Sequence, residues 1–148
     1  MTNRVFVDTS YMVALVNPRD QYHGLAASLA RTLAKRPLMT TDAVILEIGN
    51  ALSHYHRSGA IEVIHRLCNS KEVEVVRLTP NLFDEAFGLY KISHDKTWGL
   101  VDCVSFIVMR REGITEALTL DRHFAQAGFR TLMGGTSNGR GRPDIDKV

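Results

Sequence analysis

Residues 4–10 read Arg-Val-Phe-Val-Asp-Thr-Ser, a short β-branched and aromatic run that stops on a carboxylate and two hydroxyls. A run of this length and composition predicts a β-strand, and the polar residues at its end predict the start of a helix over residues 10–15. In open parallel α/β sheets, ligands bind beyond the carboxyl ends of the strands, so Asp8 is well placed for function. An Asp-Thr-Ser after a strand is also typical of an Asx turn or a helix N-cap, and both interpretations stand for this stretch alone.

Beyond this stretch, the sequence alternates predicted helices with predicted strands. Further strands are expected at residues 38–40, 73–78, 117–120 and 129–133. Helices are expected at residues 21–35, 41–57, 61–68, 80–92, 101–111 and 122–127. Asp20 is the predicted cap of the helix at 21–35, and Gly59 is the predicted stop of the helix at 41–57. Strands separated by helices predict an α/β fold with a five-stranded parallel sheet, right-handed crossovers and helices on both faces.

The composition fits one domain of ordinary size. With 148 residues, 45% of them hydrophobic, the chain is long enough to bury a core, and we expect one domain over residues 1–133. Residues 134–148 are rich in glycine and poor in apolar residues, which predicts a flexible tail. A net charge of +2 is too small to indicate nucleic-acid binding by itself.

Cysteine usage and hydropathy predict the compartment. Cys68 and Cys103 are far apart and form no Cys-x-x-Cys pair, which favours two reduced thiols and a cytoplasmic location. The N-terminus has no basic segment leading into an apolar stretch, and no run approaches the ~20 apolar residues of a membrane span. We therefore expect a soluble protein that is not exported.

Four acidic residues stand where a solvated acid is not expected. Asp8 and Asp121 follow predicted strands, whereas Glu47 and Asp102 lie near the N-terminal turns of predicted helices, among apolar residues. Semi-buried acids without basic neighbours favour a hard cation held by oxygen ligands, Mg²⁺ or Mn²⁺. Each acid also has a structural interpretation: Asp102 and Asp121 as helix N-caps, Asp8 as a turn residue, Glu47 as a snorkelling or ion-paired helix residue. Purely structural roles for all four at once are the weaker hypothesis.

Four segments are informative through their order and spacing. They read Val-Asp-Thr-Ser at residues 7–10, Thr-Asp-Ala-Val-Ile-Leu-Glu-Ile-Gly-Asn at 41–50, Trp-Gly-Leu-Val-Asp-Cys-Val-Ser-Phe at 98–106 and Ala-Leu-Thr-Leu-Asp-Arg-His-Phe at 117–124. With these segments the chain resembles the PIN-domain family, in particular the ribonuclease toxins of bacterial VapBC toxin–antitoxin modules. The resemblance covers about residues 4–133.

The resemblance implies a PIN-like three-layer α/β/α sandwich and a Mg²⁺- or Mn²⁺-dependent endoribonuclease. It implies catalytic, metal-binding acids at four positions and polar support at three: Asp8, Glu47, Asp102 and Asp121, then Ser10, Asn50 and Thr119. Of the acids, Asp8, Glu47 and Asp121 are the expected principal ligands, and Asp102 completes the site. The resemblance also implies an RNA substrate, a cognate antitoxin protein and a homodimer, for which Ile45-Ile48-Leu52 and Leu25-Leu29 offer apolar faces.

Several other residues receive lesser roles. Asp95, in the loop before Asp102, is a lower-ranked site candidate and is predicted to be a solvated turn residue. Trp98 is predicted to pack under that loop rather than to stack on a base. His54 and His56 point in different directions on a helix, so zinc is not supported. The candidate phosphate contacts are Lys35, Arg36, Arg110, Arg111, Arg122, Arg140 and Arg142, and solvated helix faces are an equal explanation for the adjacent pairs among them.

The sequence also bears on three alternative functions. A phosphoacceptor signalling domain requires an acidic pair after the first strand and a Lys after the fifth, where this chain has one Asp and Gly134-Gly135. A haloacid-dehalogenase-like phosphatase requires a second Asp at the position of Ser10. A catalytically idle PIN domain that binds RNA or a partner is the more serious alternative, and the presence of all four acids argues against it.

Overall fold

The computed structural model describes residues 3–134 of the chain. The tail predicted at residues 134–148 lies outside the described residues except for Gly134, and so do Arg140 and Arg142. Among residues 3–134, no helix is both long enough and apolar enough to cross a membrane.

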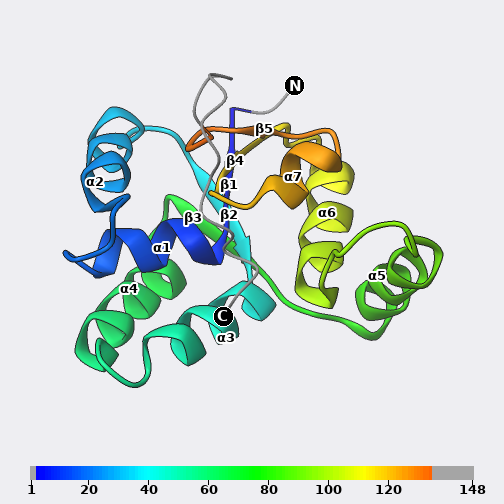
Figure 1. The fold of residues 1–148 in the computed structure, drawn as a ribbon, viewed down its shortest axis with the longest axis horizontal. Coiled ribbons are helices and arrows are strands. Elements are labelled where there is room, and N and C mark those ends of the chain that lie inside the picture. Colours follow the sequence, from blue (N-terminus) through cyan, green and yellow to red (C-terminus); the bar gives the residue numbers. More distant parts are fainter. Residues whose placement is uncertain (1–2, 135–148) are drawn as a thin grey trace.

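The described residues form a three-layer α/β/α fold around a five-stranded parallel sheet (Figure 1). The strands are β1 (Val5–Val7), β2 (Leu38–Thr41), β3 (Val73–Val76), β4 (Glu116–Leu118) and β5 (Arg130–Thr131). Their order is β3-β2-β1-β4-β5 and every neighbouring pair is parallel, so the predicted sheet is confirmed. β1 is central, and its apolar residues are fully buried because helices cover both faces of the sheet.

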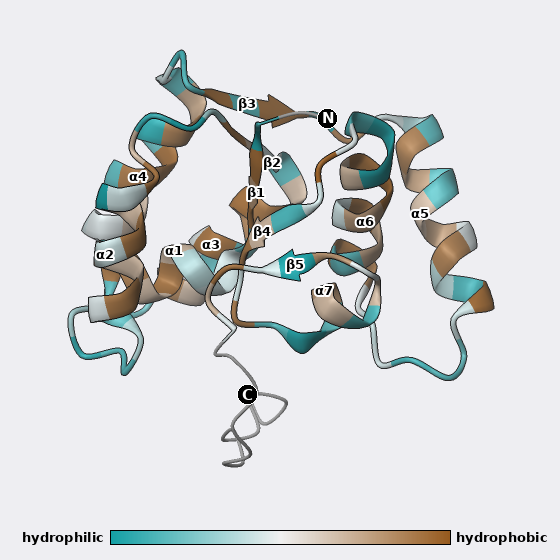
Figure 2. Cartoon of the chain, turned by 90° about the horizontal axis from the view of Figure 1, so that it is seen from above, coloured by the Kyte–Doolittle hydropathy of each residue, from teal (hydrophilic) through white to brown (hydrophobic). Residues whose placement is uncertain are grey.

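Helices lie on both sides of the sheet (Figure 2). They are α1 (Thr9–Val16), α2 (His23–Thr32), α3 (Asp42–Leu52), α4 (Arg57–Asn69), α5 (Pro80–Ile92), α6 (Leu100–Glu112) and α7 (Arg122–Gln126). Helices α1, α2 and α4 lie on one side, and α6 and α7 on the other, with α5 packed on the outside of α6 (Figure 2). Helix α3 contacts both α1 and α6, so it joins the two helical layers. Because β1 runs directly into α1 and β2 into α3, the carboxyl ends of the strands meet these helices at one end of the molecule (Figure 1).

Local signals set the start of α5 and the end of α6. Thr79 caps α5, because its Oγ1 accepts the N–H of Leu82 at 3.2 Å, and Pro80 is the first helical residue. Helix α6 ends at Glu112, and its C-cap is Gly113, whose φ of 65° is the left-handed conformation that glycine adopts most readily.

Two predicted helix boundaries are wrong. Gly59 does not end a helix, because α3 already ends at Leu52 and Gly59 lies in the first turn of α4. A Cβ atom at Gly59 would lie 2.6 Å from Val16 Cγ1, so glycine permits the close packing of α4 on α1. Asp20 does not cap a helix: its Oδ1 accepts the N–H of Tyr22 at 2.8 Å in a turn, and α2 begins only afterwards.

The strand before Asp121 ends earlier than predicted. It stops at Leu118 rather than at residue 120. The N–H groups of Leu120 and Asp121 donate to the hydroxyls of Ser10 and Thr119, at 2.9 and 3.0 Å, and do not continue the sheet. These hydrogen bonds bring the loop after β4 to the end of β1.

One of the two apolar sets that favoured a homodimer is covered within the chain. Ile48 and Leu52 are 0% and 2% exposed, because α3 packs against its neighbouring helices, so this face needs no second copy. Apolar surface is also exposed on α5, at Phe83, Phe87 and Tyr90. The ring centroids of Phe83 and Phe87 lie 6.0 Å apart and those of Phe87 and Tyr90 lie 6.4 Å apart, with the rings stacked.

Candidate functional site

The four predicted acids converge on one cavity from four separate segments. Asp8 follows β1, Glu47 lies in α3, Asp102 lies in the first turn of α6, and Asp121 precedes α7. All four line a cavity of about 750 Å³, a volume ordinary for a ligand site. None of the described residues that line it is Lys or Arg, so no basic side chain of the lining compensates for the carboxylates.

Hydroxyl groups fix Asp8 at the end of the central strand. Thr119 Oγ1–H donates to Asp8 Oδ2 at 2.7 Å, and Ser10 Oγ lies 3.3 Å from the same oxygen. Ser10 Oγ also lies 3.2 Å from Thr119 Oγ1 and accepts the N–H of Leu120 at 2.9 Å. Ser10 and Thr119 therefore join β1 to the loop after β4 around this buried carboxylate, which is 5% exposed.

The environment of Asp8 strongly disfavours its charged form. Burial raises the pKa of Asp8 from 3.8 to about 7, and the charges of Asp102 and Asp121 act in the same direction. The hydrogen bonds from Thr119 and from the Thr9 backbone lower the pKa, but only in part. Hydroxyls are neutral, so they position the carboxylate without compensating its charge. A cation in the cavity would supply that compensation.

Glu47 reaches the same cavity from α3. Its neighbours Val44 and Ile48 are buried in the core, which leaves Glu47 half-buried at the cavity wall. Thr9 Oγ1–H donates to Glu47 Oε1 at 2.7 Å. Burial raises the pKa of Glu47, the Thr9 hydrogen bond lowers it, and the negative charges across the cavity raise it. An acid on an apolar helix face requires a polar partner, and for Glu47 this partner is the Thr9 hydroxyl.

Asn50, the third predicted supporting residue, lines the cavity one turn beyond Glu47. Its side chain makes no hydrogen bond within residues 3–134, and therefore none to the four acids. Gln21 and Tyr22, which the sequence did not single out, line the cavity as well. The cavity thus combines acidic groups with neutral polar and aromatic groups.

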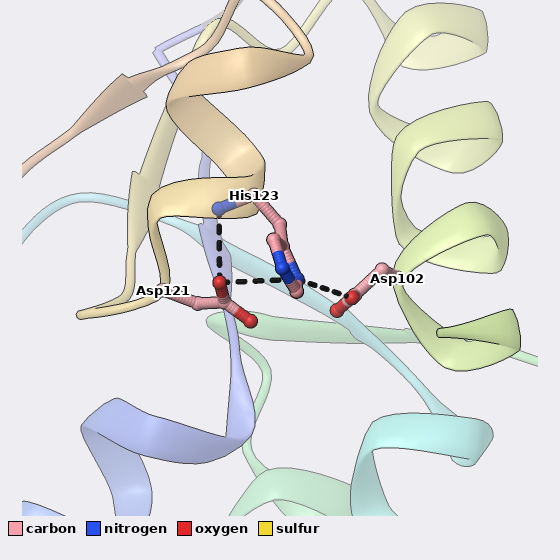
Figure 3. Close-up of side chains that lie close together, drawn as sticks. All are labelled: Asp102, Asp121 and His123. Carbon is pink, nitrogen blue, oxygen red and sulfur yellow. Dashed lines mark hydrogen bonds and ion pairs between the residues drawn. The ribbon is translucent and has the colours of Figure 1, made fainter. Parts of the chain in front are cut away.

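Asp102 and Asp121 share one histidine (Figure 3). The ring Nδ1 of His123 lies 2.9 Å from Asp102 Oδ2 and 3.2 Å from Asp121 Oδ1. Asp102 Oδ2 also accepts the N–H of Gly99 at 3.0 Å, and Asp121 Oδ1 accepts the backbone N–H of His123 at 2.9 Å. Asp121 is therefore the N-cap of α7, and Asp102 bonds back to the N-cap of α6. Because both acids also line the cavity, the cap and site roles are compatible.

Asp102 resembles Asp8 in its electrostatics. Burial raises the pKa of Asp102, and the negative charge of Asp121 adds to this effect. The Gly99 N–H and His123 act in the opposite direction. Asp8, Glu47 and Asp102 thus all have raised pKa values, as expected of a carboxylate cluster that lacks a compensating cation.

His123 is the residue of this cluster that the sequence analysis missed. It is 7% exposed, and its Nε2 lies 3.0 Å from Thr97 Oγ1. The available signal was a histidine two positions after a strand-end Asp and next to an apolar Phe124. That signal does not predict the contact with Asp102, which lies 21 positions away along the chain.

Asp95 and Trp98, which were predicted to have lesser roles, lie away from the cavity lining. Asp95 is exposed and pairs with Lys96 at 2.9 Å, as expected of a turn residue. Trp98 packs edge-on against Phe106 and donates its Nε1–H to Gln126 at 3.0 Å, so it is held under the loop as predicted.

The candidate phosphate contacts do not reach the cavity either. Arg36 pairs with Glu116 at 2.9 Å, and Arg111 pairs with Glu85. None of the candidates within residues 3–134 lines the cavity. Any role of these cations in binding phosphate would therefore be played outside the acidic centre.

The donor set fits a hard divalent cation. The acids offer carboxylate oxygens, and no cysteine is among the described residues that line the cavity. Asp102, Asp121 and His123 each have one potential ligand atom within 4.8 Å of the others. Oxygen-rich sites suit Mg²⁺ and Mn²⁺, whereas softer metals favour thiolate. The buried, uncompensated charge of Asp8 points in the same direction.

The sequence matches the family model described as the PIN domain over residues 5–130. It is 36% identical over 130 residues to the 23S rRNA-specific endonuclease VapC20 of Mycobacterium tuberculosis, in two strains, across 84% of this chain and 95% of that protein.

Solved structures agree with the sequence match. The crystal structure of Mycobacterium tuberculosis VapC20, described as a sarcin-ricin loop cleaving toxin, matches with a TM-score of 0.76 and 32% identity, over 84% of this chain and 95% of that one. FitAcB from Neisseria gonorrhoeae matches with a TM-score of 0.61 over 86% of this chain and 95% of that one. At 12% identity, this second likeness concerns the fold alone.

Proposed function

The chain belongs to the PIN-domain family, and from this premise we propose that it is a metal-dependent endoribonuclease that acts as the toxin of a toxin–antitoxin pair. The observation that carries the proposal is the convergence of Asp8, Glu47, Asp102 and Asp121 on one cavity, with no Lys or Arg among its described lining residues. The similarity to VapC20 along 84% of the chain supports it.

The acids are the proposed metal ligands and catalytic residues. Asp8, Glu47 and Asp121 hold Mg²⁺ or Mn²⁺, and Asp102 completes the site. When bound, such an ion stabilises negative charge that develops on a phosphate and makes water more acidic. The remaining contribution of the protein is to place these carboxylates before RNA arrives.

The hydroxyls provide that placement. Thr119 and Ser10 hold Asp8, and Thr9 holds Glu47, through hydrogen bonds of 2.7 to 3.3 Å. A hydroxyl that donates to a carboxylate restricts its rotation and leaves its charge intact, which suits a ligand for a cation. Asn50 supports the site differently, by offering its amide to the RNA at the cavity wall.

The substrate class follows from the similarity and from the cavity. VapC20 is specific for 23S rRNA by name, and we propose ribosomal RNA as the substrate here. Gln21, Tyr22 and Asn50 line the cavity beside the acids and offer hydrogen bonds and a ring to unpaired bases. An unpaired loop of a structured RNA fits such a surface better than a duplex does.

The test is cleavage of purified ribosomal RNA in Mg²⁺, in Mn²⁺ and in EDTA, with cut positions mapped by primer extension. We expect discrete cuts in 23S rRNA with either metal and none in EDTA. Intact RNA in both metals would refute the proposal. If the protein still retained RNA on a filter, the result would favour the catalytically idle PIN domain, which acts by binding.

The proposal includes two protein partners. A cognate antitoxin would be encoded by a short reading frame beside this one, and co-expression should relieve growth arrest caused by the toxin. We also propose a homodimer, supported by the exposed rings of Phe83, Phe87 and Tyr90 on α5 and by the exposed Leu25. Light scattering should give twice the 16.5 kDa of one chain, and a monomer at micromolar concentration would refute this part.

A further inference from the structure

We propose that His123 is a positioning residue of the acidic centre, one that fixes one oxygen of Asp102 and one of Asp121 and so leaves the second oxygen of each to a divalent cation. The inference rests on the proposed function, because it concerns the same site. It is supported by three contacts of the buried His123 imidazole, two of which involve a single oxygen each of Asp102 and Asp121 (Figure 3).

The neighbours of Nδ1 determine where the proton of the ring sits. Nδ1 lies 2.9 Å from Asp102 Oδ2 and 3.2 Å from Asp121 Oδ1. An ionised carboxylate oxygen can only accept a hydrogen bond, so Nδ1 carries a hydrogen in the neutral and in the charged imidazole alike. A nitrogen that carries a hydrogen has no free lone pair for a metal. His123 therefore acts on the carboxylates and is not itself a ligand in this arrangement.

The other side of the ring is fixed by the loop before α6. Nε2 lies 3.0 Å from Thr97 Oγ1, a hydroxyl that can donate or accept. The next residue, Trp98, ties the same loop to α7 through its 3.0 Å hydrogen bond to Gln126 and packs edge-on against Phe106. These contacts hold the ring plane, and His123 is only 7% exposed. The imidazole is thus a rigid connection between the loop and the two acids.

The hydrogen bonds fall on one oxygen of each carboxylate. Asp102 Oδ2 accepts from the Gly99 N–H and from Nδ1 of His123, and Asp121 Oδ1 accepts from the backbone N–H of His123 and faces Nδ1. Asp102 Oδ1 and Asp121 Oδ2 accept no hydrogen bond from residues 3–134. Two carboxylates that come within 4.8 Å of each other would otherwise turn apart by repulsion. The histidine keeps them together with one oxygen of each still available.

The experiment measures metal binding without RNA, by titration calorimetry with MnCl₂ and separately with MgCl₂. The variants are His123→Ala, His123→Asn and His123→Gln. The asparagine amide nitrogen takes nearly the place of Nδ1, whereas the glutamine amide nitrogen takes nearly the place of Nε2. We expect about 10- to 100-fold weaker binding of both metals in His123→Ala and His123→Gln, and rescue to near the wild-type affinity in His123→Asn.

Two further variants separate positioning from folding. His23→Asn is the matched control, because His23 Nδ1 bonds to the carbonyl of Ala14 at 2.9 Å and contacts no acid of the centre, so its metal affinity should equal that of the wild type. Thr97→Val removes the partner of Nε2 but keeps the Nδ1 donor, and should weaken binding by only about two- to tenfold. Thermal melts in EDTA establish that each variant is folded. If His123→Ala does not fold, the comparison of His123→Asn with His123→Gln decides.

Each outcome has a distinct meaning. Equal affinities in His123→Asn and His123→Gln, or an unchanged affinity in His123→Ala, would overturn the inference. A loss confined to Mn²⁺ would overturn it in favour of direct ligation, because nitrogen ligands suit Mn²⁺ better than Mg²⁺. A wild-type protein that binds neither metal would refute the proposed function itself, which is a different failure.

Discussion

The acidic centre is built from two pairs of carboxylates that are held by different chemistry. Asp8 and Glu47 are held mainly by hydroxyls, from Thr119, Ser10 and Thr9, with one backbone hydrogen bond from Thr9 to Asp8. Asp102 and Asp121 are held instead by backbone N–H groups and the ring of His123. Hydroxyl donors fix a carboxylate in place but remain neutral, so they offset the electrostatic cost of burying Asp8 and Glu47 only in part.

The difference identifies Asp8 as the residue that depends most on a bound cation. Its pKa is raised to about 7, chiefly by burial, and the hydrogen bonds to it reduce that effect only in part. At neutral pH the carboxylates of Asp8 and Glu47 are therefore well placed, but their negative charges are poorly compensated. A divalent ion would compensate these charges without moving the carboxylates. The following predictions test whether the two pairs differ in this way.

The largest effect is expected from Asp8→Asn on RNA cleavage. An amide has the size of a carboxylate and can still accept the Thr119 hydrogen bond, but it carries no charge for a metal. The loss of several kcal/mol of electrostatic stabilisation should lower the rate by about 1,000-fold or more. Single-turnover cleavage in Mg²⁺ and in Mn²⁺ measures this. Cleavage at the wild-type rate would show that Asp8 is a structural turn residue.

The second prediction concerns the stability of the metal-free protein. The pKa of Asp8 is about 7 in the folded state and near 3.8 in the unfolded chain, so the folded state binds more protons between these values. The contribution of Asp8 to the free energy of unfolding must then fall as the pH rises from about 4 to about 7. Integrated over that window, Asp8 lowers the free energy of unfolding by about 4 kcal/mol. The variant Asp8→Asn should not show this loss, because its amide does not titrate.

Urea unfolding in EDTA at several pH values checks this prediction. We expect the wild type and Asp8→Asn to have similar stability near pH 4, and the variant to be the more stable near pH 8. Millimolar Mg²⁺ should then stabilise the wild type more than the variant, since only the native wild-type site binds it well. A variant that is less stable than the wild type at pH 8 in EDTA would contradict the assigned burial cost.

The third prediction removes a hydroxyl from the Asp8 pair. Thr119→Val deletes the donor to Asp8 Oδ2 and the acceptor of the Asp121 N–H with little change of shape. We expect destabilisation by about 1–3 kcal/mol and about 10- to 100-fold weaker metal binding. Thr32→Val is the matched control, because its hydroxyl donates to the Ser28 carbonyl on an exposed face of α2, away from the acidic centre. Equal effects of the two variants would mean that the hydroxyl network does not position Asp8.

The sequence was sufficient for the parts of this centre that depend on local pattern. Asp8 and Asp121 follow short apolar runs, and Glu47 interrupts an apolar helix face, so each could be recognised from its immediate neighbours. The alternation of strands and helices then required a parallel sheet, whose strand ends lie at one edge. Convergence of the acids follows from that topology.

The parts that escaped prediction depend on contacts between distant segments. His123 reaches Asp102 because the loop containing Thr97 fixes its ring, and no local pattern reports a ring orientation. Gly59 resembles a helix stop in sequence, yet its function is to let α4 approach Val16. In both cases the deciding partner is remote in the chain, and the local signal was ambiguous or misleading.

The smallest effect is expected from Asp95→Asn, the same chemical change as Asp8→Asn in an acid outside the cavity. Asp95 precedes α6 and is exposed, and its partner Lys96 lies at 2.9 Å. The hydrogen bond from Lys96 lowers the pKa of Asp95, so any stability it contributes is present above the ordinary pKa and is lost as the pH falls below it. Solvent screens such a pair almost completely. Cleavage should therefore stay within about twofold of the wild type, and the melting temperature at neutral pH should not change.

A large loss of cleavage in Asp95→Asn would show that the loop before α6 closes onto the RNA and that the acidic centre extends beyond the four acids. An unchanged rate beside the expected collapse in Asp8→Asn would show that burial in the cavity, and not acidity alone, selects the residues that act.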